Sequence, residues 1–259
     1  MTAGAATLAL TALRGVGRVS PGDDLAAIIV RAAKDSGCAL ASGDVVAVAQ
    51  KIVSKSEGRY AVLDDVVPSP RAKELAATCL KDPRVMELVL RESRTVLRAI
   101  PNVIVVEDRR GLVLANAGID QSNVEPDADG RARALLLPED PDASAARLRE
   151  GIRRLAGVDV AVIINDSIGR AWRLGTVGTC IGASGLPGLL DLRGKPDLFG
   201  RALQTTEVGY ADELAAAASF LMGQSGEGRP VVVIRGASWP RSDGSARELL
   251  RSRDKDLFR

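Results

Sequence analysis

The chain of 259 residues carries 35 Lys and Arg against 33 Asp and Glu, which leaves a net charge of +2. Basic residues are nowhere concentrated among aromatic ones, so the composition disfavours nucleic-acid binding. The chain has no histidine, which excludes a Ser-His-Asp triad, a Cys-His pair and a histidine metal site. Any metal must therefore be held by oxygen ligands, which favours Mg²⁺ or Mn²⁺ over zinc.

Cysteine use and hydropathy predict a cytoplasmic protein with no membrane partner. Cys38, Cys79 and Cys180 are too few and too scattered for a disulfide framework. No apolar run approaches the roughly 20 residues that span a bilayer. The apolar start, residues 1–15, lacks a basic n-region and is interpreted as a first strand rather than a secretion signal.

A helix and a strand are predicted next along the chain. Ser20 and Asp23 precede an apolar-periodic stretch that starts at Leu25, which predicts a capped helix ending at Gly37. The run DVVAVAQKIVSK, residues 44–55, predicts a strand that carries polar groups out at its end.

Two helices and a hairpin follow. Pro68 and Pro70 introduce helical patterns at about residues 71–80 and 83–93. The runs NVIVVED and GLVLANAG around the turn at residues 109–111 predict a hairpin.

The middle of the chain predicts a loop, a helix and a buried strand. Residues 124–142 are rich in Pro, Asp and Gly and indicate a long surface connection. An amphipathic helix with Leu148, Ile152 and Leu155 on one face comes next, and the buried strand VDVAVII then leads straight into Asp166.

The last third predicts loops, a helix and a strand. Residues 169–200 are dense in glycine with poor periodicity and indicate a loop-rich stretch, whereas residues 211–223 predict a strong helix. A glycine loop and the strand RPVVVIRG follow. Because strands and helices alternate without a regular βαβ order, the pattern favours an α+β fold of mixed sheets and flanking helices over a doubly wound sheet.

Two acidic residues are candidate metal ligands. Asp120 in NAGIDQSN and Asp166 in INDSIGRAWR are each predicted to close a strand and open a loop of small residues. Carboxylates at strand ends are well placed to hold Mg²⁺ or Mn²⁺ against phosphate oxygens. The alternative interpretation is that each aspartate only caps the following turn.

Three basic residues are candidate anion ligands. Lys55 follows the predicted strand and precedes a glycine, where its ammonium could reach a phosphate; the alternative is a solvated surface lysine. Arg170 and Arg173 follow Asp166 closely, and their forked donors suit a carboxylate or a phosphate. An ion pair with a nearby acid is the equally good alternative for both arginines.

The glycine loop GQSGEG, residues 223–228, lies between a helix and a strand, which is opposite to the order of a P-loop. A helix C-cap followed by a turn is the simplest interpretation. Successive glycine N–H groups can also form an anion nest, and Gln224 or Glu227 could supply an oxygen ligand.

Several of these segments, in this order, resemble the coenzyme F420-0:γ-glutamyl ligase family in its stand-alone form, without a C-terminal flavin reductase domain. The matching runs are PGDDL (21–25), IVSKSEG (52–58), NAGIDQSN (116–123), INDSIGRAWRLGTVGTCIG (164–182), DLFG (197–200), ADELAAAASFLMGQSGEG (211–228) and VVVIRG (231–236). The resemblance covers nearly the whole chain.

The resemblance implies one catalytic domain over residues 1–259, two-lobed and forming an intertwined homodimer. It places metal ligands, for two Mg²⁺ or Mn²⁺ ions with K⁺ as a further candidate, at Asp120, Asp166, Ser167 and Gln224. It places nucleotide contacts at Val16, Gly17, Arg18, Val19, Lys55, Asn123, Met222, Gly223, Gln224, Ser225, Gly226, Glu227 and Gly228.

The activity that the resemblance implies is amide ligation in coenzyme F420 biosynthesis, in which L-glutamate is joined to F420-0, or to F420-1, with GTP as the energy source. An acyl phosphate is the expected intermediate, and Arg170 or Arg173 is expected to stabilise the developing charge. One alternative is a metal-dependent phosphotransferase or nucleotide hydrolase without an amine acceptor. Another is a non-catalytic dimer that senses a nucleotide.

Overall fold

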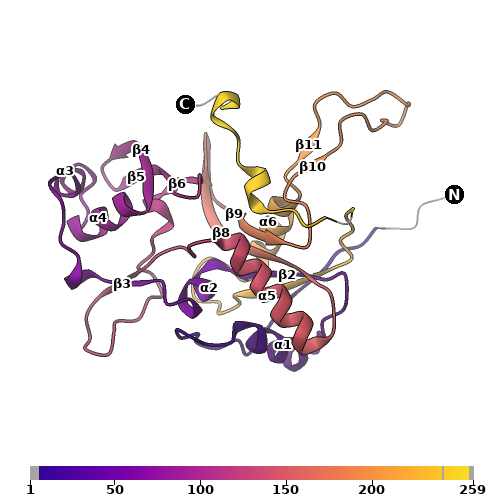
Figure 1. Cartoon of the computed structure of the whole chain (residues 1–259), viewed down its shortest axis with the longest axis horizontal. Coiled ribbons are helices and arrows are strands. Elements are labelled where there is room, and N and C mark those ends of the chain that lie inside the picture. Colours follow the sequence, from indigo (N-terminus) through magenta and orange to yellow (C-terminus); the bar gives the residue numbers. More distant parts are fainter. Residues whose placement is uncertain (1–5, 241, 257–259) are drawn as a thin grey trace.

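A five-stranded mixed sheet organises the larger part of the chain (Figure 1). In this computed structural model, residues 6–240 and 242–256 are described, and the predicted start before residue 6 lies outside them. The strands, in sheet order, are β1 (Ala9–Ala12), β12 (Val231–Arg235), β2 (Val45–Ala49), β8 (Ala161–Arg170) and β9 (Arg173–Ser184). Only β2 and β8 are parallel neighbours. The α+β class with mixed sheets is thereby confirmed.

Side-chain alternation along the strands gives the sheet two buried faces. In β2, Val46 and Val48 face one hydrophobic cluster, while Val45 and Ala47 face another, as expected because successive strand residues point to opposite sides. Helices α1 and α5 cover the first face and α6 the second. Their bounds are Leu25–Asp35 for α1, Pro141–Ala156 for α5 and Tyr210–Met222 for α6.

A smaller unit with its own core lies to one side of this sheet (Figure 1). It comprises α3 (Pro70–Cys79), α4 (Pro83–Arg91) and the three-stranded sheet β4 (Ser93–Ile100), β5 (Val103–Asp108) and β6 (Val113–Ala115). Met86, Ile104 and Val106 are fully buried in it. The two helices and the β5–β6 hairpin confirm the sequence predictions for this stretch.

Short elements complete the described part of the chain. They are α2 (Gln50–Ser56), the pair β3 (Tyr60–Val62) and β7 (Arg133–Leu135), the pair β10 (Leu190–Asp191) and β11 (Glu207–Val208), and four 3-10 helices at Leu63–Asp65, Asn116–Gly118, Ala246–Leu249 and Arg253–Lys255. The β10–β11 pair carries a long arm away from the body, at the upper right of Figure 1. Within the described residues, the helices are too short or too polar to cross a bilayer.

The predicted first helix is present, but its cap is different. The Asp24 carboxylate accepts from the Ala27 backbone N–H at 3.0 Å and caps α1. Asp23 instead accepts from the Ser20 backbone N–H at 2.8 Å in the preceding turn. The Ser20–Asp23 pair therefore closes the turn before the helix, and the prediction that this pair caps the helix was wrong, because Asp24 satisfies the same sequence pattern next to the first helical residue.

The predicted strand over residues 44–55 was too long. β2 ends at Ala49, and α2 begins at Gln50, where the Ser54 hydroxyl donates to the Gln50 amide oxygen at 3.0 Å. These residues are four apart and lie on one helix face. The apolar residues on both sides of Gln50 hid the change from strand to helix periodicity in the sequence. Because α2 includes Lys55, this lysine extends from a helix rather than from the end of a strand.

The predicted loop over residues 169–200 was wrong for its first half, which forms the long strand β9. A Cβ at Gly178 would collide with the Ser219 side chain of α6, and one at Gly182 would collide with Pro141 of α5. These glycines allow close helix–sheet packing instead of making turns. β8 likewise continues through Asp166, so Asp166 lies within a strand.

Two further expectations need correction. The predicted surface connection over residues 124–142 contains β7, and Leu135 and Leu137 within it are buried. α5 forms as predicted with Leu148 and Ile152 buried, but Leu155 is 50% exposed. One helix residue at the edge of the apolar stripe therefore faces outward.

Candidate active site

The ends of β1 and β2, the start of β12 and the middle of β8 meet at one edge of the five-stranded sheet. β1, β2 and β8 run in one direction and β12 in the other. The ends of β1 and β2 therefore lie beside the start of β12, and β8 passes the same edge at Asn165 before it continues to Arg170. Ala49 is paired with Asn165 in the β2–β8 register, and its N–H donates to the Pro230 carbonyl at 2.8 Å. Segments distant in sequence consequently surround one space.

That space is a cavity of about 760 Å³, a size that suits a small-molecule ligand. We call it the sheet-edge cavity. Its lining includes Gly17, Arg18, Val19, Lys51, Lys55, Asp120, Ser122, Asn123, Glu125, Asn165, Asp166, Ser167, Ser219 and Met222 to Gly228. The structure thus brings together all the residues predicted to hold metal and nearly all those predicted to contact nucleotide. Val16 is the exception, since it is buried in the core behind Gly17.

Asp166 offers an oxygen to this cavity. Its Oδ1 accepts from the Ser167 backbone N–H at 2.8 Å. The pKa of Asp166 is raised to about 6, mainly by burial and also by the nearby Asp120 carboxylate, while the Ser167 N–H and the Lys51 ammonium oppose the shift. Burial makes the ionised form of a carboxylate unfavourable, and a cation bound next to it stabilises that form. Asp166 is therefore suited to a divalent metal ion.

Asp120 is already paired with a cation of the chain. The Lys51 ammonium of α2 lies 2.6 Å from Asp120 Oδ2, and the Ser122 hydroxyl and N–H both donate to Oδ1, at 2.7 and 2.8 Å. Burial alone would raise the pKa of Asp120, but Lys51 and Ser122 outweigh it and lower the pKa. Asp120 is thus held ionised at the cavity wall.

Lys55 lies one helical turn after Lys51 and makes a matching contact. Its ammonium lies 2.7 Å from Glu125 Oε2. Residues four apart share one helix face, so α2 presents both lysines to the segment at residues 120–125. These two ion pairs close one side of the cavity, and a bound phosphate would compete for both ammonium groups.

The glycine loop forms another wall. Gly223 ends α6 with φ 76°, and a Cβ there would collide with the Glu227 carboxyl group. Glu227 folds back onto the loop, accepting from the Ser225 N–H at 2.8 Å. The Gln224 amide nitrogen donates to Ser219 at 3.0 Å, which leaves its carbonyl oxygen without a hydrogen bond in the described part of the chain. The loop can therefore both end α6 at Gly223 and offer the Gln224 carbonyl oxygen to a ligand.

The donor chemistry fits Mg²⁺ or Mn²⁺. Asp120, Asp166, Ser167 and Gln224 supply only oxygen atoms, and the buried Asn165 Oδ1 has no hydrogen-bond partner. The described residues contain no cluster of three carboxylate, histidine or cysteine side chains. Because Mg²⁺ commonly takes one or two carboxylates and completes its shell with water and substrate phosphates, two carboxylates at this edge suffice.

Arg170 and Arg173 do not line the cavity. Both are exposed at the tip of the β8–β9 hairpin, where Arg170 Nη2 donates to the Leu174 carbonyl at 3.3 Å. Neither of the ion pairs considered as alternatives is present within the described residues. Their catalytic role stays a prediction.

Sequence reasoning missed two charged residues of this site, Lys51 and Glu125. The spacing of Lys51 and Lys55 by four residues was a readable signal for one helix face, but it was hidden by the prediction of a strand. Glu125 lay in a segment interpreted as a surface loop, and nothing in its local sequence indicated that it pairs with Lys55.

The fold and the cavity define an α+β protein with a polar, oxygen-rich site between lysines and a glycine loop. The family described as F420-0:Gamma-glutamyl ligase matches residues 15–236. The chain therefore belongs to the F420-0:γ-glutamyl ligase family, as the sequence resemblance predicted.

Individual relatives match over almost their whole length. The chain is 48% identical to the coenzyme F420:L-glutamate ligase of Methanopyrus kandleri over 246 residues, which cover 93% of this chain and 94% of the relative. It is 45% identical to the protein of that name from Methanothermobacter thermautotrophicus, with 97% and 99% covered. For the Archaeoglobus fulgidus ligase the identity is 42%, with 95% and 94% covered.

Proposed function

We propose that this chain is a GTP-dependent ligase that joins L-glutamate to coenzyme F420-0, and to F420-1, in coenzyme F420 biosynthesis. The names of the relatives support glutamate ligation. The observation that carries the proposal is the sheet-edge cavity, where Lys55, Asp120, Asp166 and the glycine loop converge. It combines cationic groups and N–H donors for a polyphosphate with carboxylates for a divalent ion.

The proposed reaction has two steps. A carboxylate oxygen of F420-0 attacks the γ-phosphorus of GTP, and the bond to the bridging oxygen breaks so that GDP leaves with the electron pair. The amine of glutamate then attacks the carbonyl carbon of the acyl phosphate, loses a proton to solvent and expels inorganic phosphate. One GTP is consumed for each amide bond, and no histidine base is required.

The residues of the cavity divide this work. Lys55 and the N–H groups of the glycine loop, which line the cavity, would hold the phosphates, and Asp120, Asp166, Ser167 and Gln224 would hold the metal. Two Mg²⁺ or Mn²⁺ ions, with K⁺ as a further candidate, would neutralise the phosphate oxygens when bound.

We also propose that two copies form an intertwined, two-lobed homodimer. Trp172 is 81% and Leu174 99% exposed at the β8–β9 tip, and Phe199 is 89% exposed on the β10–β11 arm. Large apolar side chains so exposed favour burial by a partner. Arg170 and Arg173 lie at the same tip, so such a contact would bring them against the partner. Leu174→Asp should then yield a monomer in light scattering; an unchanged dimer mass would contradict this contact.

Mass spectrometry of F420-0 incubated with the protein, L-glutamate, GTP and Mn²⁺ tests the function. We expect one or more glutamate units to be added, and only when GTP is present. Release of phosphate from GTP at the same rate without glutamate or F420-0, and no glutamate addition, would contradict the proposal in favour of a nucleotide hydrolase.

A further inference from the structure

A second cavity, of about 630 Å³, shares no lining residue with the sheet-edge cavity. It lies between the smaller unit, the start of α5 and the segment after β12. Its basic lining residues are Arg59, Arg94, Arg109, Arg110 and Arg247. Its acidic ones are Glu92, Glu139 and Asp142. Guanidinium groups thus outnumber carboxylates on its surface, and we call it the arginine cavity.

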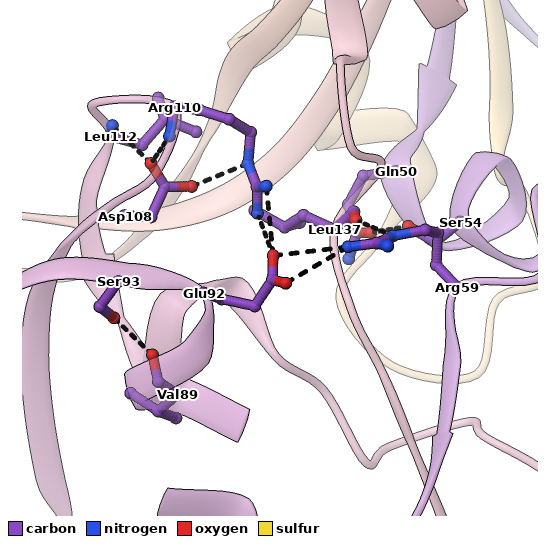
Figure 2. Close-up of polar contacts among 10 residues, drawn as sticks. All are labelled: Gln50, Ser54, Arg59, Val89, Glu92, Ser93, Asp108, Arg110, Leu112 and Leu137. Atoms are coloured by element: carbon purple, nitrogen blue, oxygen red, sulfur yellow. Dashed lines mark hydrogen bonds and ion pairs between the residues drawn. The ribbon is translucent and has the colours of Figure 1, made fainter. Parts of the chain in front are cut away.

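Two of these arginines are held rigidly on a single carboxylate (Figure 2). The Arg59 Nη2 atom lies 3.4 Å from Glu92 Oε1, and the Arg110 Nη2 atom lies 3.2 Å from Glu92 Oε2. Glu92 and Arg110 are largely buried, with side chains 14% and 13% exposed. Two guanidinium groups therefore converge on the Glu92 carboxylate.

Further contacts fix the orientation of both guanidinium groups. Arg110 Nε lies 2.8 Å from Asp108 Oδ2, and Asp108 is itself fully buried under the β5–β6 turn. Arg59 Nε donates to the Leu137 carbonyl at 2.9 Å. Each guanidinium carries five N–H donors, and Arg59 Nη1 donates no hydrogen bond within the described chain. Preorganised donors therefore remain unused next to the cavity.

Two charged residues on the rim of the cavity, Arg109 and Glu139, form no ion pair within the described chain. Arg109 is exposed and its side chain forms no ion pair there. Arg94 is 55% exposed and reaches only to 3.7 Å from Glu107. Glu139, of opposite sign, is also exposed without an ion pair in that part of the chain. Asp142 is different, because its Oδ1 already accepts from two backbone N–H groups, those of Ala183 and Ala246.

Burying guanidinium groups costs free energy of desolvation, and replacing such buried ion-pair networks by apolar residues often stabilises a protein. Buried arginines that do not add stability are therefore candidates for binding a ligand. Their planar forks match carboxylate and phosphate oxygens in pairs. We propose that the arginine cavity is a second ligand site, which binds a small oxyanion through Arg59 and Arg109. Glu139 on the same rim would accept an ammonium group, which favours an acidic amino acid over a simple anion. This inference does not rest on the ligase reaction.

Isothermal titration of the full-length protein, free of metal and nucleotide, tests the site. L-Glutamate and inorganic phosphate are titrated separately, so that the probe that binds identifies carboxylate or phosphate as the oxyanion. We expect saturable binding of at least one probe, and we expect Arg109→Gln to weaken it about tenfold, as the loss of one charge-assisted contact does. Because Arg109 is exposed and unpaired, this variant should retain its melting temperature.

Two matched variants locate the binding. Arg71→Gln removes an exposed arginine on α3 that pairs with Glu74 and lines neither cavity, and it should leave the affinity unchanged. Lys55→Ala alters only the sheet-edge cavity and should also leave it unchanged. Binding that is lost in Lys55→Ala but kept in Arg109→Gln would overturn the proposal, as would the absence of saturable binding for both probes at millimolar concentration.

Discussion

The two ends of β2 differ in how their charges are satisfied. At the start of the strand, Asp44 is 1% exposed and both its oxygens are bound by Arg235, at 2.8 Å from Nε and 2.7 Å from Nη2. Arg235 closes β12 and also donates to the Ala39 carbonyl at 2.9 Å. This end lines neither cavity, so its charges act within the chain.

At the other end of β2, charged groups remain open to a cavity. Within the described residues, the Asp166 carboxylate accepts one hydrogen bond, from a backbone N–H. Lys51 and Lys55 are paired with carboxylates of the segment at residues 120–125, which also lines the cavity. Ion pairs that a ligand can compete for are weaker constraints than a buried bidentate pair. We therefore assign a structural role to the Asp44–Arg235 pair, in which Arg235 binds both carboxylate oxygens. The charged groups at the other end of β2 are open to the cavity, and we assign them to ligand binding.

Asp166→Asn should have the largest effect on activity. The amide keeps the shape of the side chain but removes the charge that the proposed metal requires, so we expect glutamate addition to fall by at least about 100-fold. Far-ultraviolet circular dichroism and the melting temperature should be unchanged. Loss of helical signal would instead show that Asp166 is structural.

Asp44→Asn is the matched change at the opposite end of β2. It breaks a buried charge pair, and we expect the free energy of unfolding to fall by about 2 kcal/mol in urea titrations. The KM for GTP should not change in the protein that remains folded. An altered KM with wild-type stability would reverse the roles assigned to the two ends.

Lys55→Ala should raise the KM for GTP by roughly tenfold, because one charge-assisted contact to a phosphate is lost. Glu125→Gln is the control, since it frees Lys55 without removing it and should not raise the KM. Steady-state kinetics at saturating F420-0 and glutamate measure both. An unchanged KM in Lys55→Ala would refute the phosphate role.

Lys51→Ala should have the smallest effect, and in the opposite direction. The Lys51 ammonium is paired with the Asp120 carboxylate and would repel a metal cation bound there. Removing this ammonium should therefore tighten the binding of Mn²⁺ in the absence of nucleotide by about threefold. Lys51→Arg keeps the charge and should bind Mn²⁺ as the parent protein does. Weaker Mn²⁺ binding in Lys51→Ala, measured by calorimetry, would show that Lys51 instead organises the site.

The sequence predicted the regions where one signal dominates. Pro70 and Pro83 begin α3 and α4 as expected, and the apolar run before Asp166 is a buried strand. The family motifs placed Asp120, Asp166 and the glycine loop in one site, and the structure brings them to one cavity. These features depend on local chemistry or on several motifs in a fixed order.

Other features depend on tertiary packing and were not readable. The glycines of β9 look like turn residues, but Gly178 and Gly182 are small because α6 and α5 approach the sheet there. The pair Lys55–Glu125 joins residues 70 positions apart, and the contact of Arg59 with Glu92 likewise joins two units of the fold. No periodicity reports such contacts.

A crystal structure with Mn²⁺ and a non-hydrolysable GTP analogue tests the central claim most directly, since anomalous scattering locates manganese independently of the protein. We predict manganese bound by the carboxylates of Asp120 and Asp166, with Lys51 displaced, and the phosphates lying between Lys55 and residues 223–228. Manganese and nucleotide bound anywhere other than the sheet-edge cavity, including the arginine cavity, would contradict the account.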